Sequence, residues 1–152
     1  AQIQSMDISS PDFRDKGGIP LKFGYTHENK NPRIRISEVP DDAETLALLV
    51  EDPDAVEPAG KIWLHWLTWN IEPGKNMIET GESPGKEANN DFGEKGYGGP
   101  NPPDGRHRYI FRAYALDSEI KGNRDLSREE FKQRIEDHTL DKDSCTGYYP
   151  PE

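Results

Sequence analysis

Glycine and proline divide the apolar residues of this chain into short runs. The 152 residues include 14 glycines and 13 prolines. The two most apolar runs between them are "TLALLVED" (45–52) and "KIWLHWLTWNI" (61–71), and both runs are apolar on both faces. Short apolar runs bounded by turn residues are typical of β-strands, and strands that are apolar on both faces lie in the centre of a sheet. The sequence therefore predicts a mainly β domain with antiparallel strands.

Three further segments have strand patterns. Residues 3–8, "IQSMDI", and residues 32–37, "PRIRIS", read as strands, and in the second of them isoleucine alternates with arginine. Residues 106–116, "RHRYIFRAYAL", read as a third strand. Because side chains alternate across a strand, His107 and Tyr109 are expected to share one face of it.

One helix is expected near the C-terminus, in "LSREEFKQRIEDHTL" (126–140). Ser127 is a good N-cap, Glu130 completes a capping box, and Leu126 and Phe131 occupy the positions of a hydrophobic staple. A narrow stripe would then dock this helix on the sheets, and it consists of Phe131, Ile135 and His138.

A long segment between these elements has a different composition. Residues 73–105 contain eight glycines and five prolines, so regular structure is nearly excluded there. Loops of that length inside a domain are usually functional or disordered. The segment ends in "GGPNPPDGRHRY" (98–109). Glycines let a ligand approach the backbone and prolines fix the loop in shape, so its N–H groups could form a rigid anion cradle beside His107.

Composition limits the classes of function. The length favours one domain over residues 1–152. The formal net charge of −10 argues against general nucleic-acid binding and against stable association with an anionic membrane. No apolar stretch approaches the ~20 residues that cross a bilayer, and no signal peptide is recognisable. The single cysteine, Cys145, cannot form an internal disulfide, which favours a reducing, cytoplasmic location.

Ionisable residues gather at the ends of three predicted strands. Asp52 and Asp54 flank a proline directly after the run 45–52, although Asp and Pro are also ordinary turn residues. His65 lies among tryptophans in the run 61–71, where it needs a partner whether it is a core histidine or a ligand-binding one. His107 follows the glycine- and proline-rich loop. Each of these three positions is a candidate for polar chemistry.

In chain order, "VEDPDA", "WLHWLTWNI", "NDFGEKGYGGPNPPDGRHRY" and the C-terminal helix with "GYY" resemble the phosphatidylethanolamine-binding protein family, also called the Raf kinase inhibitor family. The resemblance spans roughly residues 31–149 and is strongest to the bacterial and archaeal branch. It implies a β-sandwich of two mostly antiparallel sheets with a C-terminal helix, and a small pocket at one end that takes phosphate or a similar anion.

The family's pocket residues carry over to positions of this sequence. The pocket aspartate matches Asp52, the two histidines match His65 and His107, and the tyrosine matches Tyr109. The remaining ligand-binding positions that the resemblance implies, in the turn and the pocket wall, are Asp54, Trp63, Gly99, Pro100 and Pro102.

The sequence departs from the family pattern in three places. The proline that often closes the Asp-Pro-Asp-Ala turn is Val56, and Pro58 follows two residues later. Asn101 stands where prokaryotic relatives often have cysteine, and Arg106 directly precedes His107 in a shortened loop. These differences concern the preference for a head group and leave the four polar pocket positions intact.

We expect His65 and His107 to supply N–H donors to anion oxygens, Tyr109 to add an O–H donor or to orient His107, and Asp52 to hold one imidazole in the right tautomer. Hydrogen bonds to a charged acceptor are about twice as strong as neutral ones. Affinity should then rise as pH falls through the histidine range near ~6.5.

Two other classes of function stay open. Asp52, His65 and His107 have the ligand types of a metal-dependent enzyme with two histidines and one carboxylate. The resemblance also implies that the pocket could be presented to a phosphorylated protein, with a kinase or a protease as the partner that is modulated. The main expectation is a non-catalytic protein without cofactor that binds a phosphate-containing small molecule or a phosphorylated protein, and no feature indicates its oligomeric state.

Overall fold

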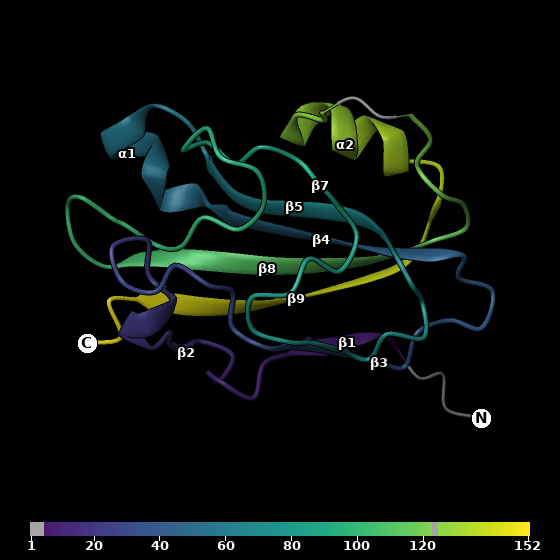
Figure 1. The fold of residues 1–152 in the computed structure, drawn as a ribbon, viewed down its shortest axis with the longest axis horizontal. Coiled ribbons are helices and arrows are strands. Elements are labelled where there is room, and N and C mark those ends of the chain that lie inside the picture. Colours follow the sequence, from purple (N-terminus) through teal and green to yellow (C-terminus); the bar gives the residue numbers. More distant parts are fainter. Residues whose placement is uncertain (1–4, 123–124) are drawn as a thin grey trace.

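The computed structural model describes residues 5–122 and 125–152, and in it two β-sheets pack face to face (Figure 1). The smaller sheet has the strand order β1 (Asp7–Ser9), β3 (Ile34–Ser37), β6 (Met77–Ile78). The larger sheet has the order β2 (Gly17–Gly18), β9 (Thr139–Tyr149), β8 (His107–Leu116), β4 (Thr45–Asp52), β5 (Trp63–Ile71), β7 (Lys86–Glu87). The helical segments are η1 (Leu21–Phe23), η2 (Pro53–Ala55), α1 (Val56–Ala59) and α2 (Arg128–Ile135). All paired strands are antiparallel except β2 and β9, so the expected two-sheet fold is confirmed.

The apolar runs of the sequence form the centre of the larger sheet. β4 has the predicted bounds and is buried along its whole length, because β5 and β8 flank it and both of its faces are covered. β5 and β8 begin within two residues of their predicted starts. β1 and β3 are shorter than predicted, and residues 3 and 4 of the first predicted strand lie outside the described residues.

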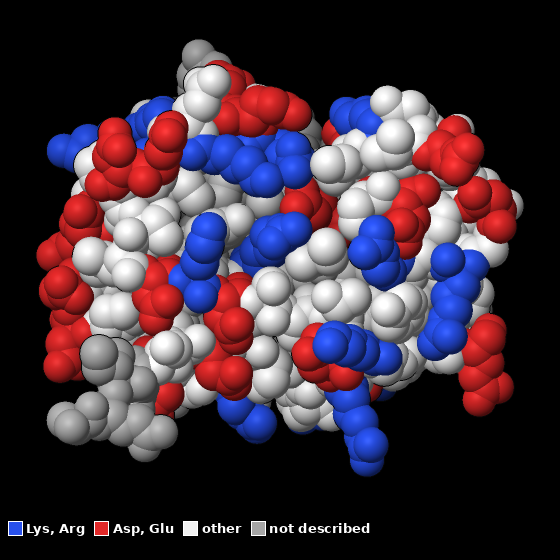
Figure 2. All heavy atoms as spheres, turned by 180° about the vertical axis from the view of Figure 1, so that it is seen from behind, with Lys and Arg blue, Asp and Glu red and all other residues white. Residues whose placement is uncertain are grey.

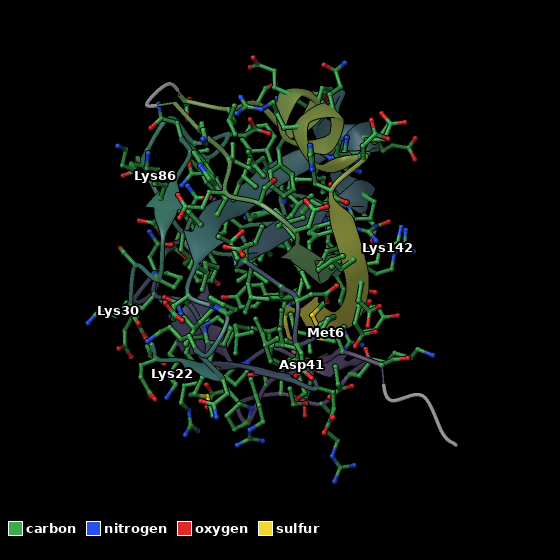
Figure 3. All side chains as sticks on the ribbon, turned by 90° about the vertical axis from the view of Figure 1, so that its right-hand side faces the viewer. Met6, Lys22, Lys30, Asp41, Lys86 and Lys142 are labelled. Carbon is green, nitrogen blue, oxygen red and sulfur yellow. The ribbon has the colours of Figure 1, made fainter. Side chains whose placement is uncertain are left out.

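Alternate residues of β4 serve two separate cores. Leu46 and Leu48 point into the core between the two sheets, whereas Ala47 and Leu49 point into a second core beneath α2. In the side view of Figure 3, α2 lies on one side of the larger sheet and the smaller sheet lies on the other. Apolar cores on both faces therefore stabilise the central strands, although only 32% of the residues are apolar.

Helix α2 begins as its sequence predicts. The backbone N–H of Glu130 donates to Ser127 Oγ (3.1 Å) and the N–H of Ser127 donates to Glu130 Oε1 (3.2 Å), which is the predicted capping box. Phe131 is fully buried. The predicted docking position of His138 is wrong, because the helix ends at Ile135 and the half-exposed His138 side chain instead bonds Asp117 on the surface.

β9 follows α2, and no pattern in the sequence predicted it. It pairs with β8 from Thr139 to Tyr149 and with β2 at Gly147 and Tyr148, so it lies between these two strands in the larger sheet. Near its start, the carboxylates of Asp141 and Asp143 accept the backbone N–H groups of Met6 and Ile8, each at 2.9 Å, and so hold the segment of β1. Polar side chains of β9 therefore join the two sheets.

The long segment 73–105 contains only the two-residue strands β6 and β7. Its last part is fixed against the turn at residues 23–29, because Pro100 accepts a hydrogen bond from the N–H of Tyr25 (2.9 Å) and Gly99 donates to Asn29 Oδ1 (2.7 Å). A Cβ atom on Gly99 would lie 2.2 Å from the carbonyl oxygen of Phe23. Glycine is therefore required there so that the two backbones can touch.

The surface is mixed in charge, with an acidic excess. Figure 2 shows Asp and Glu side chains spread over the face drawn there, with Lys and Arg side chains interspersed among them. In the side view, Lys86 and Lys142 project outward near opposite edges of the larger sheet (Figure 3). In the part of the chain that the structure describes, no helix has the length and apolar character needed to span a membrane.

Candidate functional site

A cavity of about 160 Å³ lies where three central strands meet at one end of the larger sheet. β4 ends there at Asp52, while β5 and β8 begin there at Trp63 and His107. The cavity is lined by Asp52, Ala55, Pro58, Ala59, Trp63, His65, Phe92, Asn101, Pro102, Pro103, His107 and Tyr109. A few polar groups thus converge within mostly apolar walls, as is usual for small-molecule sites.

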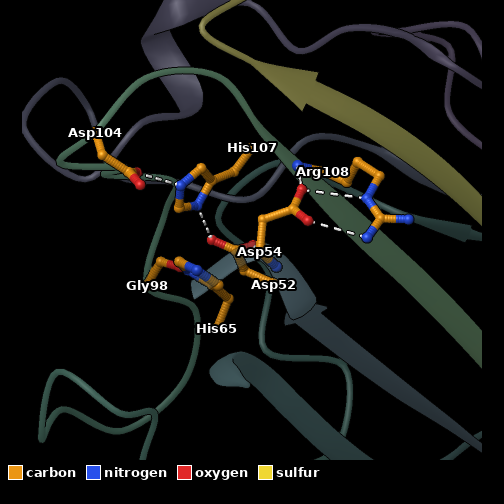
Figure 4. A network of polar contacts seen from close by, with 7 residues as sticks. All are labelled: Asp52, Asp54, His65, Gly98, Asp104, His107 and Arg108. Atoms are coloured by element: carbon orange, nitrogen blue, oxygen red, sulfur yellow. Dashed lines mark hydrogen bonds and ion pairs between the residues drawn. The ribbon is translucent and has the colours of Figure 1, made fainter. Parts of the chain in front are cut away.

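His107 holds a carboxylate on each of its ring nitrogens (Figure 4). Nδ1 lies 2.6 Å from Asp52 Oδ2, and Nε2 lies 2.5 Å from Asp104 Oδ1. Ionised carboxylates only accept hydrogen bonds, so both nitrogens must carry a proton. Burial alone would lower the pKa of His107, but the hydrogen bonds to Asp52 and Asp104 outweigh this and raise it above its usual value. His107 is therefore held as an imidazolium cation to a higher pH than a free histidine.

The two carboxylates differ in their surroundings. Asp52 is 3% exposed, and its second oxygen accepts the backbone N–H of Asp54 (2.8 Å) at the start of η2. Burial raises the pKa of Asp52, and the hydrogen bond from His107 opposes that rise. The Asp104 side chain is half exposed at the cavity mouth. Asp52 is thus a buried, fixed part of the site, whereas Asp104 contacts His107 from the solvent side.

His65 has the opposite protonation state. Its Nδ1 lies 2.7 Å from the carbonyl oxygen of Gly98, which only accepts hydrogen bonds, so Nδ1 carries the proton. Burial lowers the pKa of His65 to about 4, so the ring is neutral at physiological pH and Nε2 has a free lone pair. His65 can therefore offer an acceptor, and the expected N–H donor is not available from it.

Tyr109 lies between the two histidines. Its ring meets that of His65 edge-on (centroids 5.1 Å apart) and is roughly parallel to that of His107 (6.5 Å). The residue is 1% exposed, and none of the described residues forms a hydrogen bond of normal geometry with its hydroxyl. Burial, with the charge of Asp52 nearby, raises the pKa of Tyr109, so the hydroxyl stays protonated. The cavity therefore contains a buried O–H donor whose contact with the Asp52 carboxylate falls short of a normal hydrogen bond.

Six of the nine expected ligand-binding residues line the cavity: Asp52, Trp63, His65, Pro102, His107 and Tyr109. Asp54 does not, because it accepts three hydrogen bonds from Arg108, from its backbone N–H, Nε and Nη2. Gly99 and Pro100 do not line it either, because they bond to the turn at residues 23–29. The N–H of Gly98 donates to the carbonyl of His65 (2.8 Å). The expected N–H cradle is therefore not formed by Gly98 or Gly99.

The model of the phosphatidylethanolamine-binding protein family matches residues 9–150. The chain belongs to the phosphatidylethanolamine-binding protein family. The motifs at 50–55, 63–71 and 90–109, which indicated this family, each contribute residues to the lining of the cavity.

Relatives in archaea and bacteria share most of the chain. A UPF0098 protein of Methanothermobacter thermautotrophicus is 36% identical over 95% of this chain and 98% of its own length. A UPF0098 protein of Archaeoglobus fulgidus is 38% identical over 96% of this chain, which spans about half (51%) of that relative. Among solved structures, the phosphatidylethanolamine-binding protein homologue CT736 from Chlamydia trachomatis matches with a TM-score of 0.90 and 32% identity, over 97% of this chain and 99% of that one. Escherichia coli YbcL shares the fold (TM-score 0.86, 24% identity, 96% and 98% covered).

The structure also explains two departures of this family member. Arg106 points neither into the mouth nor freely into solvent, because it donates to the carbonyl oxygens of Pro150 and Pro151, each at 3.0 Å, and stacks over Tyr148. Asn101 lines the cavity, as the matched position implies.

The metal-dependent alternative lacks a ligand. Among residues 5–122 and 125–152, no group of three or more His, Cys, Asp or Glu side chains is arranged to hold a metal ion. Both nitrogens of His107 carry protons, so that ring has no lone pair for a metal while the two carboxylates hold it. Only Asp52 and Nε2 of His65 remain as donors from the proposed triad.

Sequence reasoning missed Asp104 and Phe92. Asp104 lies three residues before His107, and that spacing alone did not indicate a contact between them. Phe92 stacks on Tyr25 (4.0 Å between centroids) and meets the Trp63 ring edge-on (5.5 Å). An aromatic residue inside a glycine-rich loop was the one signal that could have identified it.

Proposed function

We propose that this cavity binds the phosphate group of a small molecule or of a phosphorylated head group, and that the protein acts as a binding protein without catalysis. The observation that carries the proposal is His107, a buried imidazolium whose Nε2–H already holds a carboxylate at the cavity mouth. A donor that binds a carboxylate also suits a phosphate oxygen, and charge-assisted hydrogen bonds of this kind are the strong ones.

A second donor supports the proposal. The Tyr109 hydroxyl is buried beside His107, and no described residue forms a hydrogen bond of normal geometry with it. A buried hydroxyl without a hydrogen bond costs about 1–3 kcal/mol, and a ligand oxygen would remove that cost. His65 adds an acceptor, which suits a protonated oxygen or an N–H group of the ligand rather than a bare oxyanion.

The size and lining of the cavity favour a head group. About 160 Å³ is smaller than the ~300–1,000 Å³ of pockets that enclose drug-sized ligands, so an acyl chain would remain outside. The described lining residues include no serine, threonine, cysteine or lysine, and the nucleophile types that are present are aspartate, histidine and tyrosine. These features suit binding better than group transfer.

Titration calorimetry with inorganic phosphate and with O-phosphoethanolamine tests the proposal. The wild type should bind, and His107→Gln should bind at least tenfold more weakly because the cationic donor is lost. His138→Gln is the matched control, since His138 also pairs with an aspartate but lies on the surface outside the cavity. Equal heats for His107→Gln and the wild type would contradict the proposal.

A further inference from the structure

Four cationic side chains gather on the side of the larger sheet that carries α2. Arg112 lies on β8, and Lys142 lies on β9, two residues from the position opposite Arg112. Arg128 and Lys132 lie on α2. Lys and Arg side chains gather across the upper middle of the face drawn in Figure 2. We call these four residues the basic face.

A single buried carboxylate fixes the two arginines. Glu51 is 2% exposed and accepts hydrogen bonds from Nε of Arg112 (2.8 Å) and from Nε of Arg128. Among the described residues, no group accepts a hydrogen bond from Nη1 or Nη2 of Arg112, and this side chain is 35% exposed. Arg112 is therefore held by one edge and presents the other to solvent. A guanidinium edge of this kind binds a carboxylate through two parallel hydrogen bonds.

Two lysines add positive charge beside these arginines. In the described part of the chain, the ammonium groups of Lys132 and Lys142 form no hydrogen bond and no ion pair. Burial lowers the pKa of Lys132, Glu51 opposes this, and the two arginines add to it, so these charges act on one another. The carboxylates paired with the arginines are Glu51 and the exposed Glu129. Four cations and two carboxylates give this face a net charge of +2, although the chain as a whole has −10.

The strand beside the arginines is open to solvent. Leu140, two residues before Lys142, is 38% exposed. A hollow of about 270 Å³ lies beside it, and the hollow is lined by Arg112, Tyr114, Lys142, Asp143 and Ser144. The Asp143 carboxylate faces the other side of the sheet, where it accepts the backbone N–H of Ile8. The hollow therefore presents a guanidinium and an ammonium group close to an exposed leucine.

We propose that the basic face docks a short acidic segment of a partner protein. Carboxylates of the segment pair with Arg112 and the two lysines, and an apolar side chain contacts Leu140. Because Arg112 is already fixed by Glu51, little side-chain entropy is lost on binding. The inference does not rest on the phosphate site, because Glu51 and Asp52 are successive residues of β4 and point to opposite sides of the sheet.

Charge complementarity favours this occupant over other partners. Opposite charges steer two proteins together and fix how they meet. In about 0.1 M salt, charges more than ~10 Å apart are largely screened, so a short segment on the basic face is little affected by the acidic surface elsewhere. A nucleic acid would extend past the four cations onto that acidic surface, where few counterions could be released.

Fluorescence anisotropy with two rhodamine-labelled peptides tests the proposal. One peptide is rich in glutamate and leucine, and the other has glutamine in place of each glutamate. The wild type should bind the acidic peptide and not the neutral one. Its affinity should fall severalfold when the salt concentration is raised from about 50 mM to about 300 mM, because the ion pairs are exposed.

A double variant, Lys132→Gln with Lys142→Gln, removes two of the cations. Neither ammonium group has a partner in the described part of the chain, so thermal unfolding should equal that of the wild type. Loss of two exposed ion pairs should weaken the acidic peptide by about two- to thirtyfold. The matched control is Lys22→Gln with Lys30→Gln, since both lysines are exposed and project on the other side of the molecule from Lys142 (Figure 3). Equal weakening in both double variants would show a general charge effect and overturn the proposal.

The other outcomes separate the basic face from the cavity. His107→Gln should bind the acidic peptide as the wild type does, and a loss of peptide binding there would place the peptide in the cavity and overturn the docking surface. A wild type that binds neither peptide also overturns it, while the phosphate titration still decides the cavity. Sedimentation identifies the occupant: a wild type that dimerises through Lys132 and Lys142 would show that a second copy, and not a separate partner, covers the basic face.

Discussion

Removing the Tyr109 hydroxyl should stabilise the protein and weaken its site at the same time. The residue is 1% exposed, and its hydroxyl has only a weak contact with the Asp52 carboxylate that falls short of a normal hydrogen bond. An unpaired buried hydroxyl costs about 1–3 kcal/mol. We use the lower end, because the charge of Asp52 nearby still attracts the hydroxyl proton. Tyr109→Phe should therefore raise the free energy of unfolding by about 1 kcal/mol, which corresponds to about 2–4 °C in Tm for a domain of this size.

The control is the same substitution at a hydroxyl that has a partner. Tyr97 donates to the carbonyl oxygen of Phe23 at 3.0 Å, so Tyr97→Phe loses a hydrogen bond and should lower the free energy of unfolding by about 1 kcal/mol. Thermal and urea unfolding measure both variants without ligand, and calorimetry with phosphate measures binding. A Tyr109→Phe protein that is as destabilised as Tyr97→Phe would refute the reasoning, because the hydroxyl would then have a partner in the free protein.

Three other predictions concern the charge, the backbone and the helix. Phosphomonoester affinity should be greatest between the second pKa of the ligand, about 6, and the raised pKa of His107, and calorimetry across pH should show it falling as His107 loses its proton above that value. Gly99→Ala should lower the free energy of unfolding by about 1–3 kcal/mol or more, because its Cβ would lie 2.2 Å from the Phe23 carbonyl oxygen. Gly74→Ala, whose Cβ would meet only a side-chain atom at 3.7 Å, should be tolerated in the same urea titration. Ser127→Ala should cost about 1 kcal/mol in thermal unfolding, since the N-cap hydrogen bond to α2 is lost.

The central strands could be predicted from the sequence because burial on both faces leaves a continuous apolar run. β4 is such a strand, and its predicted and observed bounds agree. β9 could not be predicted, because in "TLDKDSCTGYY" the first inward-facing positions are Thr139, Asp141 and Asp143, whereas Leu140 is exposed. The structure gives the reason: Asp141 and Asp143 accept the N–H groups of Met6 and Ile8, so the residues that obscure the strand pattern are those that dock β1.

The candidate site, like the strands, could be predicted only in part. Asp52, His65, His107 and Tyr109 could be placed together because of the family resemblance, and the structure gives the reason: β4, β5 and β8 are antiparallel neighbours whose ends meet at one edge. Their protonation states could not be predicted. Burial keeps His65 neutral, the Gly98 carbonyl fixes its proton on Nδ1, and Asp104 occupies the Nε2–H donor of His107. Both contacts come from the loop 98–105, whose path depends on tertiary bonds such as that from Gly99 to the turn at residues 23–29.

Two adjacent acidic residues at the end of β4, Glu51 and Asp52, differ in whether the charge of their partner can change with pH. Glu51 is 2% exposed and accepts hydrogen bonds from Arg112 (2.8 Å) and Arg128. Burial alone would raise the pKa of Glu51, but the two arginines lower it, and their own charge is permanent. Asp52, on the opposite face, has a histidine as its partner, and a histidine can lose its charge near neutral pH. On one face of β4, Glu51 therefore holds α2 through arginines whose charge does not change with pH. On the other face, Asp52 presents to the cavity a histidine whose charge does change. A change of pH or of ligand should then alter the site without weakening the sheet.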